Sequence, residues 1–200
     1  MENKVIYFEG LGPENTDVTF RLVQERLKSL GVKKLVLAST TGATARKAMD
    51  FFKGQDIKLI VVPHQYDFRR DKNPFPQELV ETLRASGHQV HFGTMLFHTD
   101  DLYGTSIPTI MANLLRCFSQ GVKVCFEIVL MTTDAGLLDS GERVIAVAGT
   151  GKGSDTALVV QAASTQHIRN LRINEIICKP LNPLNTDELR EIISKEMARR

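Results

Sequence analysis

The sequence contains no tryptophan, no long apolar run and only three cysteines. No segment approaches the roughly eighteen apolar residues that a membrane-spanning helix needs. The first residues, "MENKVIYFEG", lack the basic segment, apolar stretch and cleavage site of a secretion signal. Cys117, Cys125 and Cys178 show no CxxC spacing and lie in apolar surroundings, which favours buried thiols in a reducing compartment over disulfides or zinc. We therefore expect a cytoplasmic protein with no membrane partner.

The sequence also lacks an excess of charge of either sign. Lysine and arginine together number 25 against 23 acidic residues, which gives a net charge of +2. Proteins that bind nucleic acids usually carry a concentrated basic surface, so we do not expect a nucleic-acid partner. The 200 residues are 42% hydrophobic and contain no linker, internal repeat or low-complexity tract. They are enough for one compact core, so we expect a single domain over residues 1–200.

Short apolar runs alternate with segments that repeat apolar residues at helical spacing. The runs that predict strands are residues 4–10, 34–40, 57–63, 89–95, 143–149, 156–163 and 173–181. Helical patterns cover residues 18–30, 42–52, 76–87 and 185–200, the last with Asn185 or Thr186 as its cap. This alternation predicts an α/β fold, a three-layer α/β/α sandwich around a mostly parallel sheet. The polar loop "TGKGSD" predicts a hairpin, and with it an antiparallel strand at the edge of the sheet.

The segment from Ser106 to Gly136 is harder to interpret. Residues from Val122 to Met131 are apolar on too many faces for periodicity to distinguish a helix from a strand. We favour two consecutive helices that break near Gly121. Glu127 lies inside this apolar run, where a buried carboxylate needs a partner or a raised pKa. The alternative is that Glu127 belongs to the polar face of a helix.

The stretch "STTGATARKAM" follows the predicted strand "KLVLA" directly. In parallel α/β sheets, ligands bind outside the carboxyl ends of the strands, near the point where the strand order reverses. Ser39, Thr40, Thr41 and Thr44 surround a helix start whose backbone N–H groups are unpaired, and Gly42 leaves room for a ligand. The helix dipole favours an anion at this end, so the stretch can hold a phosphate. The alternative is a simple helix cap, for which one hydroxyl suffices.

Two segments resemble one known domain. "ASTTGATARKAMDFF" resembles the motif T-x-S-G-x-S/T-A in the C-terminal α/β domain of pyruvate kinase, where this motif holds a phosphate of the sugar-bisphosphate activator. "GERVIAVAGTGKGSDTALVV" is similar to the end of the same domain, with Asp155 where asparagine is usual. The resemblance covers most of the chain from Ser39 to Val160. It implies a pyruvate kinase C-terminal domain-like fold, and no kinase activity, because a chain of this length has no room for the separate catalytic barrel.

The chain also resembles stand-alone, uncharacterised archaeal and bacterial proteins of this domain type, through "EGLGPENTDVTF" together with "ASTTGATA". The resemblance to these proteins suggests flavin mononucleotide (FMN) as a bound ligand. It therefore implies the binding of a phosphorylated small molecule. The residues that we predict to bind this ligand are Asn15, Thr16, Ser39, Thr40, Thr41, Gly42, Ala43, Thr44, Gly149, Thr150 and Gly151.

Five aromatic residues fall in two loops at the same predicted end of the sheet. They could cover a flat ligand ring, or they could pack beneath the loops that carry them. These residues are Tyr66, Phe68, Phe75, Phe97 and Tyr103.

His64 and His98 are the candidate catalytic residues, because each lies at or just beyond the carboxyl end of a predicted strand and could act as acid or base near neutral pH. We expect no metal site, since His88 and His91 point to opposite faces of their strand. Three functions stay open. The first is the binding or sensing of a phosphorylated small molecule. The second is a flavin-dependent or phospho-substrate enzyme, and the third is an assembly domain, a homo-oligomer without a ligand.

Overall fold

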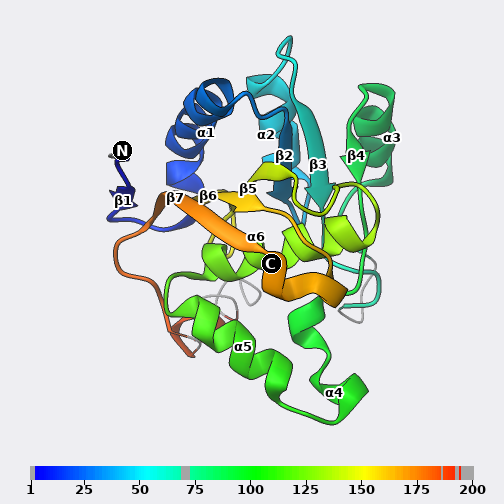
Figure 1. Ribbon diagram of the computed structural model, residues 1–200, viewed down its shortest axis with the longest axis vertical. Coiled ribbons are helices and arrows are strands. Elements are labelled where there is room, and N and C mark those ends of the chain that lie inside the picture. Colours follow the sequence, from blue (N-terminus) through cyan, green and yellow to red (C-terminus); the bar gives the residue numbers. More distant parts are fainter. Residues whose placement is uncertain (1–2, 69–72, 186, 192–193, 195–200) are drawn as a thin grey trace.

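The computed structural model describes residues 3–68, 73–185, 187–191 and 194. It shows a seven-stranded sheet in the order β1-β7-β6-β5-β2-β3-β4 (Figure 1). The strands are β1 (Ile6–Phe8), β2 (Lys34–Ala38), β3 (Lys58–Val62), β4 (Gln89–Val90), β5 (Arg143–Ala148), β6 (Thr156–Gln161) and β7 (Arg172–Pro180). The α-helices are α1 (Thr16–Leu30), α2 (Ala43–Phe51), α3 (Gln77–Ala85), α4 (Asp100–Tyr103), α5 (Ile107–Arg116) and α6 (Gln120–Asp134). Short 3₁₀ helices are η1 (Gly12–Asn15), η2 (Leu96–His98) and η3 (Thr165–Asn170).

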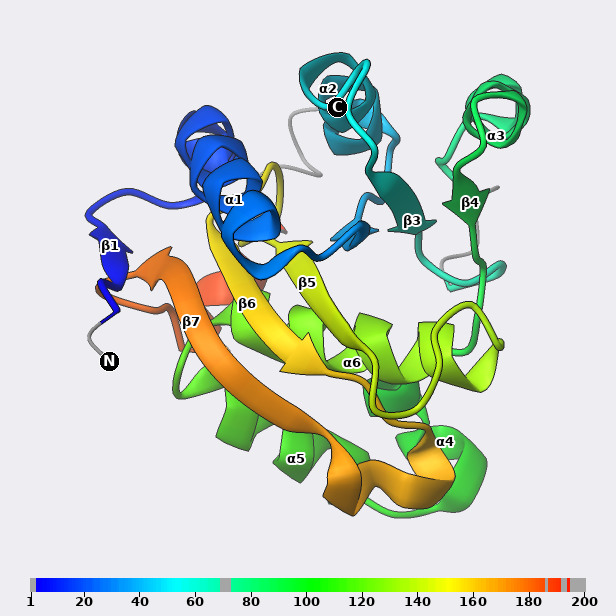
Figure 2. The same cartoon turned by 45° about the horizontal axis from the view of Figure 1, so that its top comes forward.

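Helices cover both faces of the sheet (Figure 2). Helices α1, α2 and α3 lie on one face and α6 on the other, while α5 packs outside α6. The side chains of β2 alternate between the two faces, so that Leu35 and Leu37 join the core under α1 to α3, and Val36 joins the core under α6. Near-continuous apolar strands of this kind are buried on both faces. The three-layer α/β/α sandwich with a mostly parallel sheet is therefore confirmed.

The antiparallel strand lies inside the sheet and not at its edge. Strand β6 pairs antiparallel with β5 on one side and with β7 on the other, and β1 then pairs parallel with β7. The expectation of an antiparallel edge strand was wrong because β7 and β1 extend the sheet beyond β6. Ile6 pairs with Cys178, and a pairing between such distant segments leaves no local pattern in the sequence.

The segment from Val122 to Met131 is helical, as part of α6. The favoured pair of consecutive helices is confirmed, and the break falls at Cys117 to Ser119, just before Gly121. It falls there because the Ser119 hydroxyl accepts a hydrogen bond from the Val122 amide, at 3.0 Å, and so caps α6.

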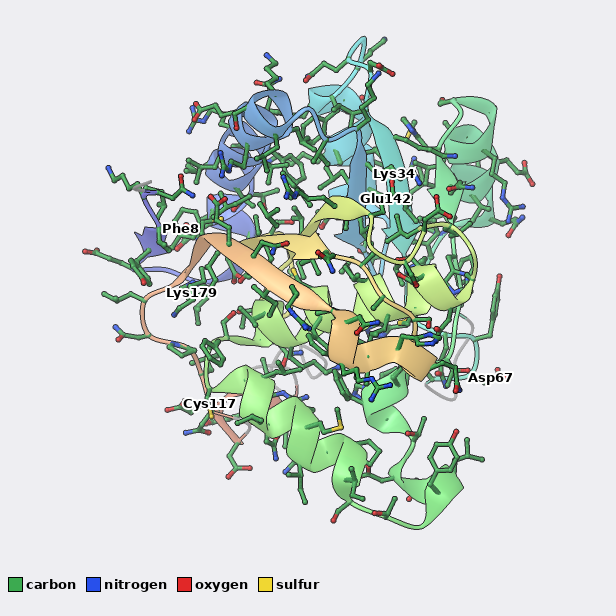
Figure 3. All side chains as sticks on the ribbon, viewed as in Figure 1. Phe8, Lys34, Asp67, Cys117, Glu142 and Lys179 are labelled. Atoms are coloured by element: carbon green, nitrogen blue, oxygen red, sulfur yellow. The ribbon has the colours of Figure 1, made fainter. Side chains whose placement is uncertain are left out.

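Cys117 is exposed at the end of α5 (Figure 3), so the expectation that all three thiols are buried was wrong for this residue.

Strand β4 is shorter than the sequence predicts, and the C-terminal helical segment lies only partly within the described residues. Strand β4 covers only Gln89–Val90, because it pairs with β3 alone and the chain leaves the sheet after His91. Asn185 caps the last helical segment, since its Oδ1 accepts hydrogen bonds from the amides of Asp187 and Glu188. The alternative cap, Thr186, lies outside the described residues.

None of the described helices combines the length and apolar character needed to cross a membrane.

Strands β2 and β5 are central neighbours, and an ion pair joins their amino-terminal ends. The Nζ of Lys34 lies 2.9 Å from the Oε2 of Glu142, and Figure 3 shows these two side chains close together. The chain runs outward from β2 through β3 to β4 and then returns to β5 on the other side of β2. The strand order therefore reverses between β2 and β5, which is where ligands bind in sheets of this type.

Candidate functional site at the carboxyl edge of the sheet

Two of the predicted loops flank the point at which the strand order reverses. Leu37 of β2 pairs in parallel with Val147 of β5, so the loops that begin at Ser39 and Gly149 leave the same edge of the sheet side by side. Ser39 is also tied to β3, because its amide donates to the carbonyl oxygen of Val62 at 3.2 Å. His64 therefore leaves the sheet next to the same turn. The topology brings three separately predicted segments to one edge.

The turn before α2 uses one of its hydroxyls to cap the helix. The Oγ of Ser39 accepts a hydrogen bond from the Ala45 amide at 3.2 Å, and Ser39 is buried. This is the capping role that the sequence left open as an alternative. Thr44 is buried as well, whereas Thr41 and Ala43 are exposed and Thr40 is half-buried. The surface that this turn offers to a ligand thus consists of Thr40, Thr41 and the first backbone N–H groups of α2.

Gly42 serves the packing of this turn against α3. Its φ is 84°, a left-handed conformation that favours glycine, and it is the N-cap residue of α2. A Cβ at this position would lie 2.6 Å from the Cδ2 of Leu79 and 3.2 Å from the Cδ of Pro76. The space that the missing side chain leaves is therefore filled by the start of α3. The sequence-based explanation that Gly42 makes room for a ligand fails on this side of the backbone.

A buried carboxylate fastens the glycine-rich loop between β5 and β6. The Oδ2 of Asp155 accepts hydrogen bonds from the amides of Gly12, at 2.9 Å, and Thr150, at 3.0 Å. Its Oδ1 accepts one from the hydroxyl of Thr156 at 2.8 Å, and Asp155 is fully buried. Asp155 therefore joins the loop after β1 to the loop after β5. The predicted hairpin between β5 and β6 is confirmed, and Asp155 fastens its loop to the loop after β1.

Several predicted ligand-binding residues have partners within the chain. The Oγ1 of Thr16 accepts a hydrogen bond from the Ser154 amide at 3.0 Å, and the Nδ2 of Asn15 donates to the Gly10 carbonyl oxygen at 3.0 Å. The amide of Thr150 is already bound to Asp155. Gly149 and Thr150 are half-buried, and Gly151 is exposed at the tip of the loop. These residues shape the edge of the site, and the exposed threonine turn offers the clearest contacts for an anion.

The close approach of the glycine loop to η1 can be tested with a matched pair of alanine variants. Gly153 and Gly151 both have positive φ, 66° and 76°. A Cβ at Gly153 would lie 2.3 Å from the Cα of Pro13, whereas one at Gly151 would meet nothing within 4 Å. We expect Gly151→Ala to cost roughly 1–2 kcal/mol for the left-handed conformation. We expect Gly153→Ala to cost roughly 1–3 kcal/mol more, because it overpacks against backbone. Urea unfolding measures both, and equal losses would show that the loop does not approach Pro13.

The two candidate catalytic histidines come together around one aromatic ring. The ring of Phe68 packs edge-on against His64, with centroids 4.9 Å apart, and against His98, with centroids 5.0 Å apart. The His64 carbonyl oxygen accepts a hydrogen bond from the Nδ2 of Asn73 at 2.8 Å. The sequence suggested either histidine separately, and the structure places them in a single cluster.

Glu127 is the buried anion of this cluster. Its Oε2 accepts a hydrogen bond from the Nζ of Lys123 at 2.5 Å, and its Oε1 accepts one from the Phe97 amide at 2.9 Å. The Nδ1 of His98 lies 3.9 Å from the same Oε1, which is ion-pair distance and too long for a hydrogen bond. Burial raises the pKa of Glu127, but His98, Lys123 and the Phe97 amide outweigh this effect and lower the pKa to about 2.

Lys123 is the partner that the sequence interpretation missed. It is as deeply buried as Glu127, and its Nζ lies 5.2 Å from the centre of the Phe97 ring. Burial lowers the pKa of Lys123 by more than the attraction of Glu127 raises it. Glu127 differs because His98, Lys123 and the Phe97 amide together lower its pKa by more than burial raises it. The signal was present, since a Lys and a Glu four residues apart lie on the same side of a helix. Of the two readings left open for Glu127, the structure supports the buried carboxylate with a partner.

The aromatic residues of the two loops have different roles. Phe75 and Phe97 are buried beneath their loops, and Tyr103 is exposed on α4. Tyr66 is exposed and packs against Phe92, with ring centroids 4.8 Å apart. The packing alternative therefore describes Phe75 and Phe97. Of these five residues, Phe68 is the one whose ring packs against both histidines.

Two open hollows lie at the opposite, amino-terminal edge of the sheet. Their volumes are about 530 and 320 Å³, and both are lined by the segment from Gln55 to Ile57. Asp56 in this segment pairs with Lys33 at the surface. Ligands of parallel sheets bind at the carboxyl edge, so we place the candidate site there and not in these hollows. The described ranges contain no group of three or more His, Cys, Asp or Glu side chains that could hold a metal ion.

Comparisons with known proteins identify one family model that matches most of the chain. The family model for the "pyruvate kinase, alpha/beta domain" matches residues 17–160. A crystal structure of a pyruvate kinase from Cryptosporidium parvum aligns with 16% identity and a TM-score of 0.40, covering 74% of this chain and 22% of that one. The Cryptosporidium parvum pyruvate kinase in complex with ADP aligns with 17% identity and a TM-score of 0.38, covering 70% of this chain and 22% of that one.

Proposed function

The chain belongs to the pyruvate kinase alpha/beta domain family, and we propose that it binds a phosphorylated small molecule at the carboxyl edge of its sheet. The observation that carries the proposal is the position of the threonine turn before α2. This turn and the glycine loop after β5 flank the point where the strand order reverses. The resemblance of "ASTTGATA" to the phosphate-holding segment of pyruvate kinase supports the same position.

Three physical features of the turn support an anionic ligand. The amides of Ala43 and Thr44 have no intrahelical acceptor, whereas the Ala45 amide donates to Ser39, and the helix dipole places partial positive charge at this end. The exposed Thr41 and the half-buried Thr40 add side-chain donors next to these N–H groups. Tyr66, on the loop that follows β3 at the same edge of the sheet, is exposed and could pack one side of its ring against a ligand. FMN combines a phosphate with a flat ring, and we propose it as the first ligand to test.

The most direct first experiment asks what the purified protein retains. An absorbance scan in the visible flavin region, followed by mass spectrometry of the denatured protein, identifies any bound small molecule. We expect a phosphorylated compound, with a flavin spectrum if that compound is FMN. A preparation that holds no ligand, and that binds neither FMN nor inorganic phosphate on titration, would favour the assembly domain without a ligand.

The addition of a negative charge tests the turn itself. We expect Thr41→Glu to weaken FMN binding at least tenfold, because a carboxylate among the N–H groups repels the phosphate. The same carboxylate interacts favourably with the helix dipole by roughly 0.3–1 kcal/mol, so the variant should unfold no earlier than the wild type. Thr82→Glu is the matched control, since Thr82 is an exposed threonine on α3. Isothermal titration measures affinity, and full FMN affinity in Thr41→Glu would remove this turn from the site.

A second candidate function is acid–base catalysis on a phosphorylated substrate, with His98 as the acting group. The observation that favours it is the buried Glu127 carboxylate, which the Phe97 amide and Lys123 hold 3.9 Å from the Nδ1 of His98. A carboxylate beside one ring nitrogen of a histidine leaves the other nitrogen for a substrate. Incubation with FMN followed by an assay of released phosphate tests this function. If the wild type releases phosphate from FMN and the His98→Gln variant does not, catalysis is favoured. If FMN stays intact, binding alone is favoured.

A further inference from the structure

Helices α4 and α5 present an apolar surface that no described part of the chain covers. Seven large apolar side chains on these helices and the residues directly after α5 are between 36 and 71% exposed. They are Leu102, Tyr103, Ile107, Ile110, Met111, Leu114 and Phe118. We call this surface the α4–α5 face. Helix α5 lies outside α6, on the side of the molecule away from the sheet (Figures 1 and 2).

The outward side of α5 has the pattern of a helix surface that packs against another. Ile107, Ile110, Leu114 and Phe118 recur at spacings of three or four residues and so form one stripe. Ala112, on another side of the helix, is buried, and α5 packs against α6 and η2. The inward contacts of α5 are thus already made within the chain. A large exposed apolar surface on a folded protein marks an interaction site.

The charges around the α4–α5 face argue against a membrane. From Leu96 to Gln120 the charged residues are Asp100, Asp101 and Arg116. Asp100 accepts hydrogen bonds from Thr109, and Arg116 donates to Asn113 and Gln120, so both are bound within the chain. A helix that lies on a lipid surface carries lysines and arginines along its polar side. The segment contains no lysine, and its one arginine, Arg116, is bound within the chain, so the face favours a protein partner.

The size and the apolar character of the face point to a second copy of this chain. Side chains of this size carry up to roughly 200 Å² each, so the seven expose on the order of 800 Å² together. A stable interface of standard size buries about 800 Å² on each partner. A two-fold pair buries the same patch on both copies, and an apolar patch is complementary to itself. We propose that the chain forms a two-fold symmetric dimer in which the α4–α5 faces cover one another.

Light scattering during gel filtration of the full chain, at several concentrations, tests the dimer. We expect the wild type to have twice the chain mass of 22.3 kDa. Leu114→Glu, at a side chain that is 66% exposed, should weaken the dimer at least tenfold and yield the monomer. Leu181→Glu is the matched control, since Leu181 is 51% exposed and lies outside the face, and it should remain a dimer. Ile110→Glu is a second variant, and thermal melts check that each variant is folded.

Two results would overturn the proposal. A wild type that stays monomeric at every concentration would mean that a different protein, or another part of this chain, covers the face. A Leu114→Glu variant that stays as dimeric as Leu181→Glu would place the dimer contact elsewhere. Neither result bears on ligand binding, because the threonine turn and the α4–α5 face are separate surfaces that are tested with separate variants.

Discussion

Replacing Asp155 by alanine should lower the free energy of unfolding by at least about 3 kcal/mol. The carboxylate is fully buried and accepts hydrogen bonds from the amides of Gly12 and Thr150 and from the hydroxyl of Thr156. Alanine would leave these donors without their acceptor, and each buried donor without a partner costs roughly 1–3 kcal/mol. The loops after β1 and β5 would then separate at the edge where we place the ligand. Urea unfolding followed by circular dichroism measures the loss.

Asp155→Asn is the matched control for this prediction. Its side-chain oxygen can still accept from Gly12 and Thr150, and its amide can donate to the Thr156 hydroxyl, which is able to accept as well as donate. We expect a loss below about 1.5 kcal/mol, as for a typical hydrogen bond of neutral groups. The asparagine is also the residue that is usual in the pyruvate kinase segment. If asparagine were as damaging as alanine, the negative charge and not the hydrogen-bond geometry would hold the loops together.

Glu127→Gln should cost roughly 3–5 kcal/mol, because it leaves the buried ammonium of Lys123 without its counter-charge. Glutamine keeps an oxygen for the Phe97 amide, so the loss reports on the ion pair and not on that hydrogen bond. The double variant Lys123→Met with Glu127→Gln removes both charges and should recover most of the stability, since uncharged replacements of buried pairs are often neutral. A double variant no more stable than Glu127→Gln would contradict the assignment of the loss to an unpaired Lys123.

The same carboxylate predicts a loss of stability in acid. The pKa of Glu127 is about 2 in the folded protein against its usual value of 4.5, so the folded state favours the charged form. Its contribution is fully present above pH 4.5 and is lost as the pH falls from there toward 2. This contribution of Glu127 to the free energy of unfolding is on the order of 3 kcal/mol. Urea unfolding across this range should show a steeper loss for the wild type than for Glu127→Gln, and parallel curves would contradict the lowered pKa.

Local sequence patterns predicted the elements that depend on neighbours in the chain. Strands β2, β3 and β5 appear as apolar runs because they are buried on both faces of the sheet. Their parallel order follows from the helices between them, and it places the loops after Ala38, Val62 and Ala148 at one edge. The location of the candidate site could therefore be predicted from the sequence.

Contacts between distant segments could not be predicted. The pairing of Ile6 with Cys178 places β1 beside β7, and no local pattern encodes it. Gly42 looked like an opening for a ligand, but its backbone lies against Leu79 of α3, a contact set by the packing of two helices. Asp155 stood out in the sequence only because it replaces the usual asparagine, although it joins Gly12 to Thr150 across the sheet edge. In each case the partner lies far away in the sequence.

Backbone amide spectra recorded during a titration with FMN test the proposed binding site most directly. We expect the largest shifts at the amides of Thr40 to Thr44, with smaller shifts at Gly149 to Gly151, because these groups surround the point where the strand order reverses. Inorganic phosphate should shift the first group alone. An absence of shifts with either ligand, or shifts centred on the opposite edge around Asp56 and His88, would contradict a phosphate site at the start of α2.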